Sequence, residues 1–156
     1  MKLYPLLFEA TVAYTGILKL KPTEQQLGFL QQKQREIKDP EAVPLKEQNL
    51  HVTLVHQTVL KHIEKNIGKP ILKAIIAKFI EENPAPTIEF LDEVEQRQDE
   101  GRKSWVVWVK DQEPLKEYVL RLIRTVNPSV TADPEPERRF HVSLANLTGN
   151  TADSVR

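Results

Sequence analysis

The 156-residue chain contains no cysteine, so disulfide bonds and thiolate chemistry are excluded. No apolar run approaches the length that crosses a membrane, and the apolar stretch near the N-terminus is too short for a signal peptide. We therefore expect a cytoplasmic protein without a membrane partner, located in the producing cell or, if the gene is viral, in a host cell.

Neither sign of charge is in excess, because 22 lysine and arginine residues balance 22 aspartate and glutamate residues. Binding long duplex DNA or an anionic membrane needs an extended positive surface, so we expect neither as a partner. A small nucleotide needs only a local positive patch, so the charge balance does not exclude a small nucleotide as a ligand. The length and a hydrophobic fraction of 40% fit one domain over residues 1–156, which we expect to be a monomer.

Two short segments share one pattern of residues. Residues 50–54 read Leu-His-Val-Thr-Leu, and residues 140–144 read Phe-His-Val-Ser-Leu. Both alternate with the period of a β-strand, so the histidine and the hydroxyl residue of each segment point to one face and the valine and leucine to the other. Two such strands brought together would place two imidazoles and two hydroxyl groups in one cleft.

The chemistry that fits this set is cleavage of a phosphodiester. An imidazole has a pKa near 6.5, so of two histidines in a cleft one can be the general base while the other is the general acid. We therefore predict His51 and His141 as the catalytic pair, with Thr53 and Ser143 donating hydrogen bonds to the phosphate oxygens. No cofactor or metal is expected, because the other histidines do not have metal-ligand spacing with His51.

Other candidate ligand contacts are less specific. Tyr14 and one of two tryptophans could stack on a base, but an aromatic residue in a strand is more often part of the core. Trp105 and Trp108 have opposite strand parity, so only one can face the cleft, and Trp105 is the slightly favoured choice. Arg139, beside Arg138, could hold a phosphate, although a basic pair in an acidic loop is equally well a local ion-pair set.

Hydrophobic periodicity predicts strands and helices in a repeated order. The expected strands span residues 10–18, which could also form a bent hairpin, and residues 49–57, 87–94, 104–110 and 140–147. The expected helices span residues 22–38, 58–83 and 113–127, with Gly68 and Pro70 breaking the second into two. A charged loop is expected over residues 96–103. The order predicts an α+β protein in which two antiparallel sheets flank a central cleft with helices outside, and in which a lobe boundary lies near residues 83–86.

The paired segments resemble the H-x-[ST]-hydrophobic signature of the 2H phosphoesterase superfamily. That superfamily includes plant and yeast cyclic nucleotide phosphodiesterases, bacterial RNA 2′–5′ ligase-like proteins and viral enzymes that destroy host signalling oligonucleotides. The resemblance implies a bilobal, pseudo-twofold α+β fold, metal-free catalysis, and functional roles for His51, Thr53, His141 and Ser143. Because the N-terminus departs from the ligase-like branch, the chain looks closer to the "Swiss Army knife" RNA-repair-like branch.

Two functional hypotheses follow from these patterns. The first is a metal-independent phosphodiesterase that cleaves 2′,3′-cyclic phosphate ends or short 2′–5′-linked or cyclic oligoribonucleotides. The second is a non-catalytic module that binds an RNA end or a nucleotide. The presence of both histidines favours the enzyme, since a binding module could dispense with either.

Overall fold

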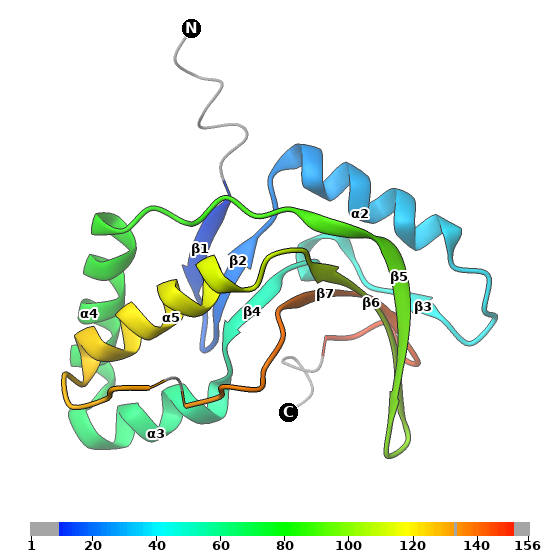
Figure 1. The fold of residues 1–156 in the computed structure, drawn as a ribbon. Helices are drawn as coiled ribbons and strands as arrows, with labels where there is room; N and C mark the ends of the chain where they lie inside the picture. The colour runs from blue at the N-terminus through cyan, green and yellow to red at the C-terminus, as the bar shows by residue number, and fades with distance from the viewer. Residues whose placement is uncertain (1–9, 133, 152–156) are drawn as a thin grey trace, which may run out of the picture.

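The computed structural model describes residues 10–132 and 134–151, which form one antiparallel sheet and the helices around it (Figure 1). The strands of the sheet are β1 (Thr11–Tyr14), β2 (Leu18–Lys21), β3 (Val43–Pro44), β4 (Val52–Val55), β5 (Phe90–Asp99), β6 (Arg102–Val109) and β7 (His141–Asn146). The α-helices of the described residues are α2 (Glu24–Glu36), α3 (Gln57–Ile67), α4 (Lys69–Glu82) and α5 (Glu113–Val126), with a 3-10 turn, η1 (Glu47–Asn49). The α+β prediction is confirmed.

The two motif strands lie next to each other at the centre of the sheet. The strand order is β1-β2-β4-β7-β6-β5, and β3 pairs with the end of β7. Each motif strand therefore has one hairpin on its outer side, β1–β2 beside β4 and β5–β6 beside β7. In each half the chain runs in the same order, from hairpin to helix to motif strand.

The prediction of two separate sheets is wrong, because the two halves are joined edge to edge. The junction between β4 and β7 is narrow, with Val52 opposite Val142 as its one register pair among the described residues. Joining the inner edges gives hydrogen-bond partners to backbone groups that two separate sheets would leave exposed. The chain passes between the halves through the link from α4 to β5, which contains residues 83–86.

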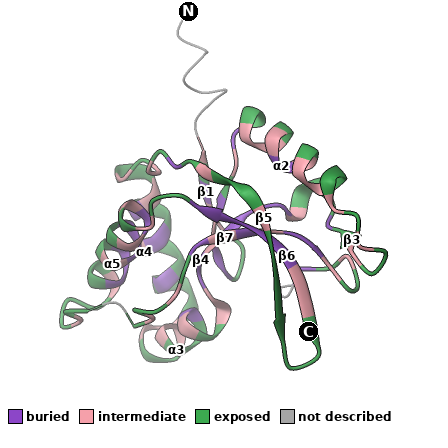
Figure 2. Ribbon diagram, turned by 45° about the vertical axis from the view of Figure 1, so that its right-hand side comes forward, coloured by how far each residue is buried: buried purple, intermediate pink, exposed green. Residues whose placement is uncertain are grey.

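One face of the sheet is apolar and is covered by the helices. Val52, Leu54, Val142 and Leu144 are fully buried in a single core cluster. Each of the four described α-helices contributes to that cluster, and the contributing side chains include Leu30 of α2, Leu60 of α3, Leu72 and Ile76 of α4, and Leu115 and Leu122 of α5. Figure 2 shows buried residues concentrated in the sheet, with exposed residues on the outer sides of the helices. Since the helices take up the apolar face, the opposite face is the one available to a ligand.

The helix boundaries follow their sequence signals. Thr23 caps α2, and its hydroxyl accepts a hydrogen bond from the Gln26 backbone N–H while the Gln26 side chain accepts one from the Thr23 N–H. Gly68 separates α3 from α4 with a φ of 89°, a conformation that favours glycine. The predicted break in the long helical pattern is therefore confirmed at Gly68.

The predicted charged loop over residues 96–103 is wrong, because most of it is strand. β5 and β6 continue to a two-residue turn at Glu100 and Gly101, which have φ values of 32° and 78°. Positive φ at both positions matches the tight turns of two-residue hairpins. β5 is an edge strand with largely exposed side chains, so charged residues are tolerated there and do not indicate a loop.

The prediction that the N-terminal apolar stretch is not a signal peptide concerns residues 1–9, which lie outside the described residues. Within the described part of the chain, none of the helices combines the length and apolar character needed to span a bilayer.

Candidate functional site

The sheet register brings the four motif side chains onto one face. Val52 pairs with Val142 in an antiparallel arrangement, so the register sets His51 opposite Ser143 and Thr53 opposite His141. The two histidines are therefore diagonal neighbours, and such positions lie about 7–8 Å apart. Their side chains leave the face opposite to the buried valines, which is the face that the helices do not cover.

His51 lies in the wall of a small hollow. It immediately precedes β4, is 9% exposed, and borders a cavity of about 190 Å³. The other lining residues are Thr15, Gly16, Ile17, Lys19, Asn49, Gln57 and Thr151. Lys19 pairs with Thr53 across β2 and β4, which adds a cation to the histidine face. Sequence reasoning missed Lys19 because the neighbour of β2 in the sheet cannot be read from the sequence.

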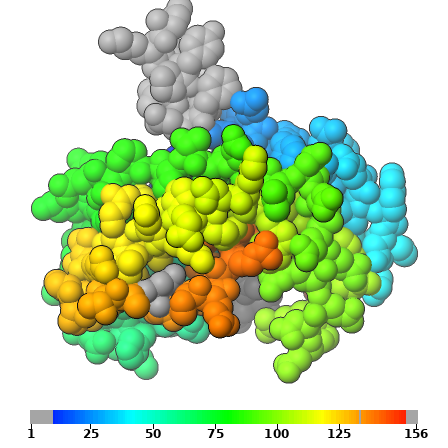
Figure 3. All heavy atoms as spheres, viewed as in Figure 1, coloured from blue at the N-terminus to red at the C-terminus, as the bar shows by residue number. Residues whose placement is uncertain are grey.

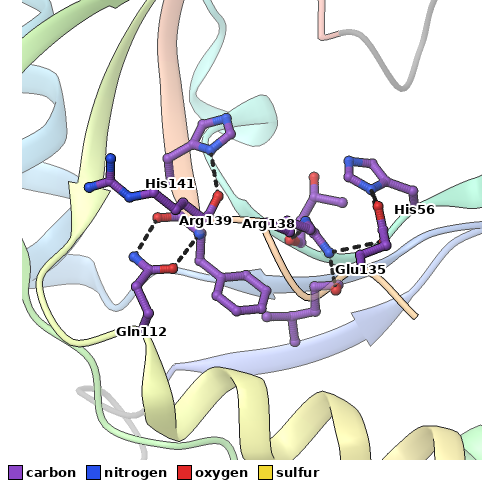
Figure 4. Close-up of polar contacts among 9 residues, drawn as sticks. His56, Gln112, Glu135, Arg138, Arg139 and His141 are labelled. Atoms are coloured by element: carbon purple, nitrogen blue, oxygen red, sulfur yellow. Dashed lines mark hydrogen bonds and ion pairs between the residues drawn. The ribbon is translucent and has the colours of Figure 1, made fainter. Parts of the chain in front are cut away.

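His141 is held by its own backbone. Its Nδ1 lies 3.1 Å from the carbonyl oxygen of Arg139 (Figure 4). A carbonyl oxygen only accepts hydrogen bonds, so in the neutral imidazole the proton resides on Nδ1 and the lone pair on Nε2. The contact thus fixes which nitrogen of His141 is available as a base.

The surroundings of His141 favour its neutral form. Burial lowers the pKa of His141 from 6.5 to about 4 and outweighs the hydrogen bond to Arg139, which raises it. The positive charges of Arg97 and Arg138, and of His56 when protonated, contribute to the same lowering of the pKa. At neutral pH this histidine is therefore a proton acceptor, ready to take a proton when a negatively charged group arrives.

The lowered pKa predicts a specific loss of stability in acid. The unfolded chain takes up a proton at this histidine near pH 6.5, whereas the folded chain does so only near pH 4. Between these values the unfolded state holds more protons, so the free energy of unfolding falls as the pH falls. Between pH 7 and pH 4.5 the free energy of unfolding should therefore fall by about 2–3 kcal/mol less in His141→Asn than in the unaltered protein.

Urea denaturation of the protein and of His141→Asn at both pH values measures this difference. Other acid-sensitive groups, such as Asp39 with its pKa lowered by a backbone hydrogen bond and by Lys103, contribute equally to both proteins and cancel. An identical loss of stability in the two proteins would show that His141 titrates normally.

Gln112 anchors the segment that enters β7. Its side-chain Nε2 donates to the carbonyl oxygens of Val109 at 2.7 Å and of Phe140 at 3.1 Å, and its Oε1 accepts from the Phe140 N–H. Figure 4 shows these contacts directly beside the Arg139 carbonyl that holds His141. Gln112 therefore positions His141 through the backbone. Sequence reasoning missed it because nothing in the sequence pairs residue 112 with residue 140.

Arg138 joins the entry to β7 to the first motif strand. It donates to the carbonyl oxygens of Thr53 and Leu54, and its guanidinium lies 3.8 Å from Glu135. Glu135 also lies 3.2 Å from Nδ1 of His56, the N-cap residue that precedes α3. The guanidinium of Arg138 thus binds backbone carbonyls and a carboxylate of the protein itself. Figure 4 shows Arg139 extending away from this cluster, so of the two arginines Arg139 is the one placed to meet a ligand.

Two predicted ligand contacts lie away from the histidine face. Tyr14 packs against the core, where burial and Glu64 of α3 raise the pKa of its hydroxyl. Trp105 pairs with Ala145 and lines a larger hollow, about 400 Å³, whose walls contain neither histidine. The preference for Trp105 is corrected: Trp108 pairs with His141, and their rings meet edge to face with centroids 5.2 Å apart. Strand parity places the two tryptophans on opposite faces, but the identity of the apolar face follows only from the packing of the helices.

The chain matches no protein-family model, and comparisons with curated proteins and with solved structures find no similar protein. Among the side chains that the structure describes, no three of His, Asp or Glu gather as metal ligands would.

Proposed function

We propose that the protein is a phosphodiesterase of the 2H type, which cleaves 2′,3′-cyclic phosphate ends or short oligoribonucleotides by acid–base catalysis between two histidines. The observation that supports this proposal most strongly is the Val52–Val142 register, which sets both histidines and both hydroxyl residues on one face. The repeated order of hairpin, helix and motif strand fits the bilobal, pseudo-twofold fold that the resemblance implies.

His141 is the proposed general base and His51 the general acid. In hydrolysis of a cyclic phosphate, Nε2 of His141 takes a proton from water while the water oxygen bonds to phosphorus. The bond from phosphorus to one ribose oxygen breaks, and that oxygen receives a proton from His51. The resulting protonation states are reversed by exchange with solvent. The Nδ1 contact with the Arg139 carbonyl and the lowered pKa of His141 support this division of roles.

The bound phosphate itself should make His141 a stronger base. A negative charge beside His141 raises the pKa of an imidazole that is otherwise kept neutral, so proton uptake becomes favourable once the substrate is bound. The Val52–Val142 register sets Thr53 and Ser143 opposite the two histidines, which supports a role for their hydroxyls as donors to the non-bridging oxygens. Lys19, which pairs with Thr53, adds positive charge on the His51 side.

A turnover assay with a panel of small substrates tests the proposal. We expect hydrolysis of nucleoside 2′,3′-cyclic phosphates or short 2′–5′-linked or cyclic oligoribonucleotides, and undiminished rates in excess EDTA, because the proposed steps use only side chains of the chain. Product analysis identifies the phosphate position. Loss of activity in EDTA and its return with a divalent ion would replace this mechanism with a metal-dependent one. Binding without turnover would instead identify a nucleotide-binding module.

A further inference from the structure

Trp108 connects His141 to two arginine side chains. The guanidinium carbon of Arg139 lies 3.9 Å from the centre of the Trp108 ring, and that of Arg97 lies 5.4 Å from it. The His141 ring lies 5.2 Å from the same ring. Because Arg139, Arg97 and His141 all contact the same Trp108 ring, both positive charges lie close to His141, the proposed base.

The sheet register turns Arg97 toward the histidine face. Arg97 of β5 pairs with Ser104 of β6, and Trp108 of the same strand pairs with His141. Ser104 and Trp108 have equal strand parity, so Arg97 shares a face with His141. Figure 3 shows the hairpin that carries Arg97 projecting beside the segment that leads into β7.

Within the part of the chain that the structure describes, neither arginine forms an ion pair. Among residues 10–132 and 134–151, no carboxylate lies within 4.0 Å of the guanidinium nitrogens of Arg97 or Arg139. The nearby Glu95 accepts a hydrogen bond from the indole N–H of Trp108, which fixes the ring that both arginines contact. The surroundings of Trp108 therefore contain two exposed cations, Arg97 and Arg139, and one carboxylate, Glu95. This is a local excess of positive charge in a protein with no net charge.

We propose that Arg97 and Arg139 form a second phosphate subsite beside His141, so that the preferred substrate is a ribonucleotide carrying a further phosphate beyond the one that is cleaved. The inference rests on the proposed function. A guanidinium matches a phosphate by two parallel hydrogen bonds, whereas the Trp108 ring is already stacked by Arg139 and has little exposed area for a base. The subsite distinguishes an RNA fragment from a simple cyclic mononucleotide.

Three substrates test the subsite: a nucleoside 2′,3′-cyclic phosphate, the same nucleotide with a 5′-phosphate, and a dinucleotide with a 2′,3′-cyclic end. We expect kcat/KM for one or both of the compounds with a second phosphate to exceed that of the first by ~10-fold or more, the effect of a charge-assisted hydrogen bond. The two longer compounds separate a terminal phosphate from an internal phosphodiester.

Arg97→Gln should reduce that preference by ~10-fold, and Arg139→Gln should act in the same direction because its backbone carbonyl, which holds His141, is retained. Arg102→Gln is the matched control. It removes the same charge from an exposed position at the tip of the same hairpin, and the preference should persist.

Equal kcat/KM for the three substrates, or an equal loss on all three in Arg97→Gln, would overturn the subsite while leaving the proposed function intact. Absence of turnover on every substrate would overturn the proposed function. In that case calorimetric binding of the same compounds decides the subsite: the second phosphate must tighten binding to the protein, and Arg97→Gln must reduce the difference.

Discussion

Replacing either motif histidine by alanine is expected to lower kcat by about 10²–10⁴-fold, the contribution typical of a positioned acid or base. In the proposed mechanism each histidine carries half of one coupled proton transfer, so neither can take over the role of the other. The double variant should be little worse than either single variant, because residues that act as a unit do not contribute additively. Steady-state kinetics on the best substrate of the panel measure all three variants.

His62→Ala is the matched control for this experiment. His62 is exposed on α3 and belongs to neither motif strand, so its variant should keep full activity. Circular dichroism should show that all variants fold, because the motif histidines lie on the face that the helices leave uncovered. Near-normal turnover in either His51→Ala or His141→Ala would end the proposal of a two-histidine mechanism.

The second large effect concerns the substrate. A short oligoribonucleotide whose cleaved linkage is flanked by a 2′-hydroxyl should be turned over, and its 2′-deoxy counterpart should be inert. The 2′-oxygen is either the nucleophile or a member of the cyclic phosphate, so its removal eliminates the reaction and does not merely weaken binding. Long duplex DNA should also be inert, because the chain has no net positive charge to hold it.

Product formation from matched ribo and deoxy substrates, under identical conditions, decides this point. A deoxy substrate in which only a distant nucleotide lacks its 2′-hydroxyl is the control and should be cleaved normally. Equal rates on the fully deoxy and ribo substrates would exclude chemistry at ribonucleotide ends and leave a general phosphodiesterase.

The sequence predicted the elements of this protein better than their arrangement. The motif strands, the break at Gly68 and the helix that starts at Glu113 carry local signals, because strand alternation, glycine conformation and helix periodicity act within a few residues. The joining of β4 to β7 has no local signal. It depends on which strand edges meet after the helices cover one face, so the sequence alone predicts two sheets.

The contrast between local signals and long-range contacts also explains which residues of the candidate site the sequence predicts. His51, Thr53, His141 and Ser143 follow from a repeated pattern, and the register confirms that the structure brings them onto one face. Lys19, Gln112 and Arg97 become visible only through contacts with residues far away in the chain. The choice between the tryptophans needed one further fact, namely that Val107 and Val109 belong to the buried core.

The antiparallel junction of β4 and β7 also has a consequence for the orientation in which a substrate would bind. An antiparallel pair has a local twofold axis between its strands, so Val52 and Val142 are related by symmetry, as are the two histidines. A ribonucleotide has no such symmetry, since in the proposed hydrolysis the attacking oxygen belongs to water and the leaving oxygen belongs to the ribose. The motifs alone would therefore accept the substrate in either orientation. If the proposed reaction takes place, its polarity should be set by the residues that break this symmetry: Lys19 and a hollow lie on one side, and an imidazole held by a backbone carbonyl lies beside two arginines on the other.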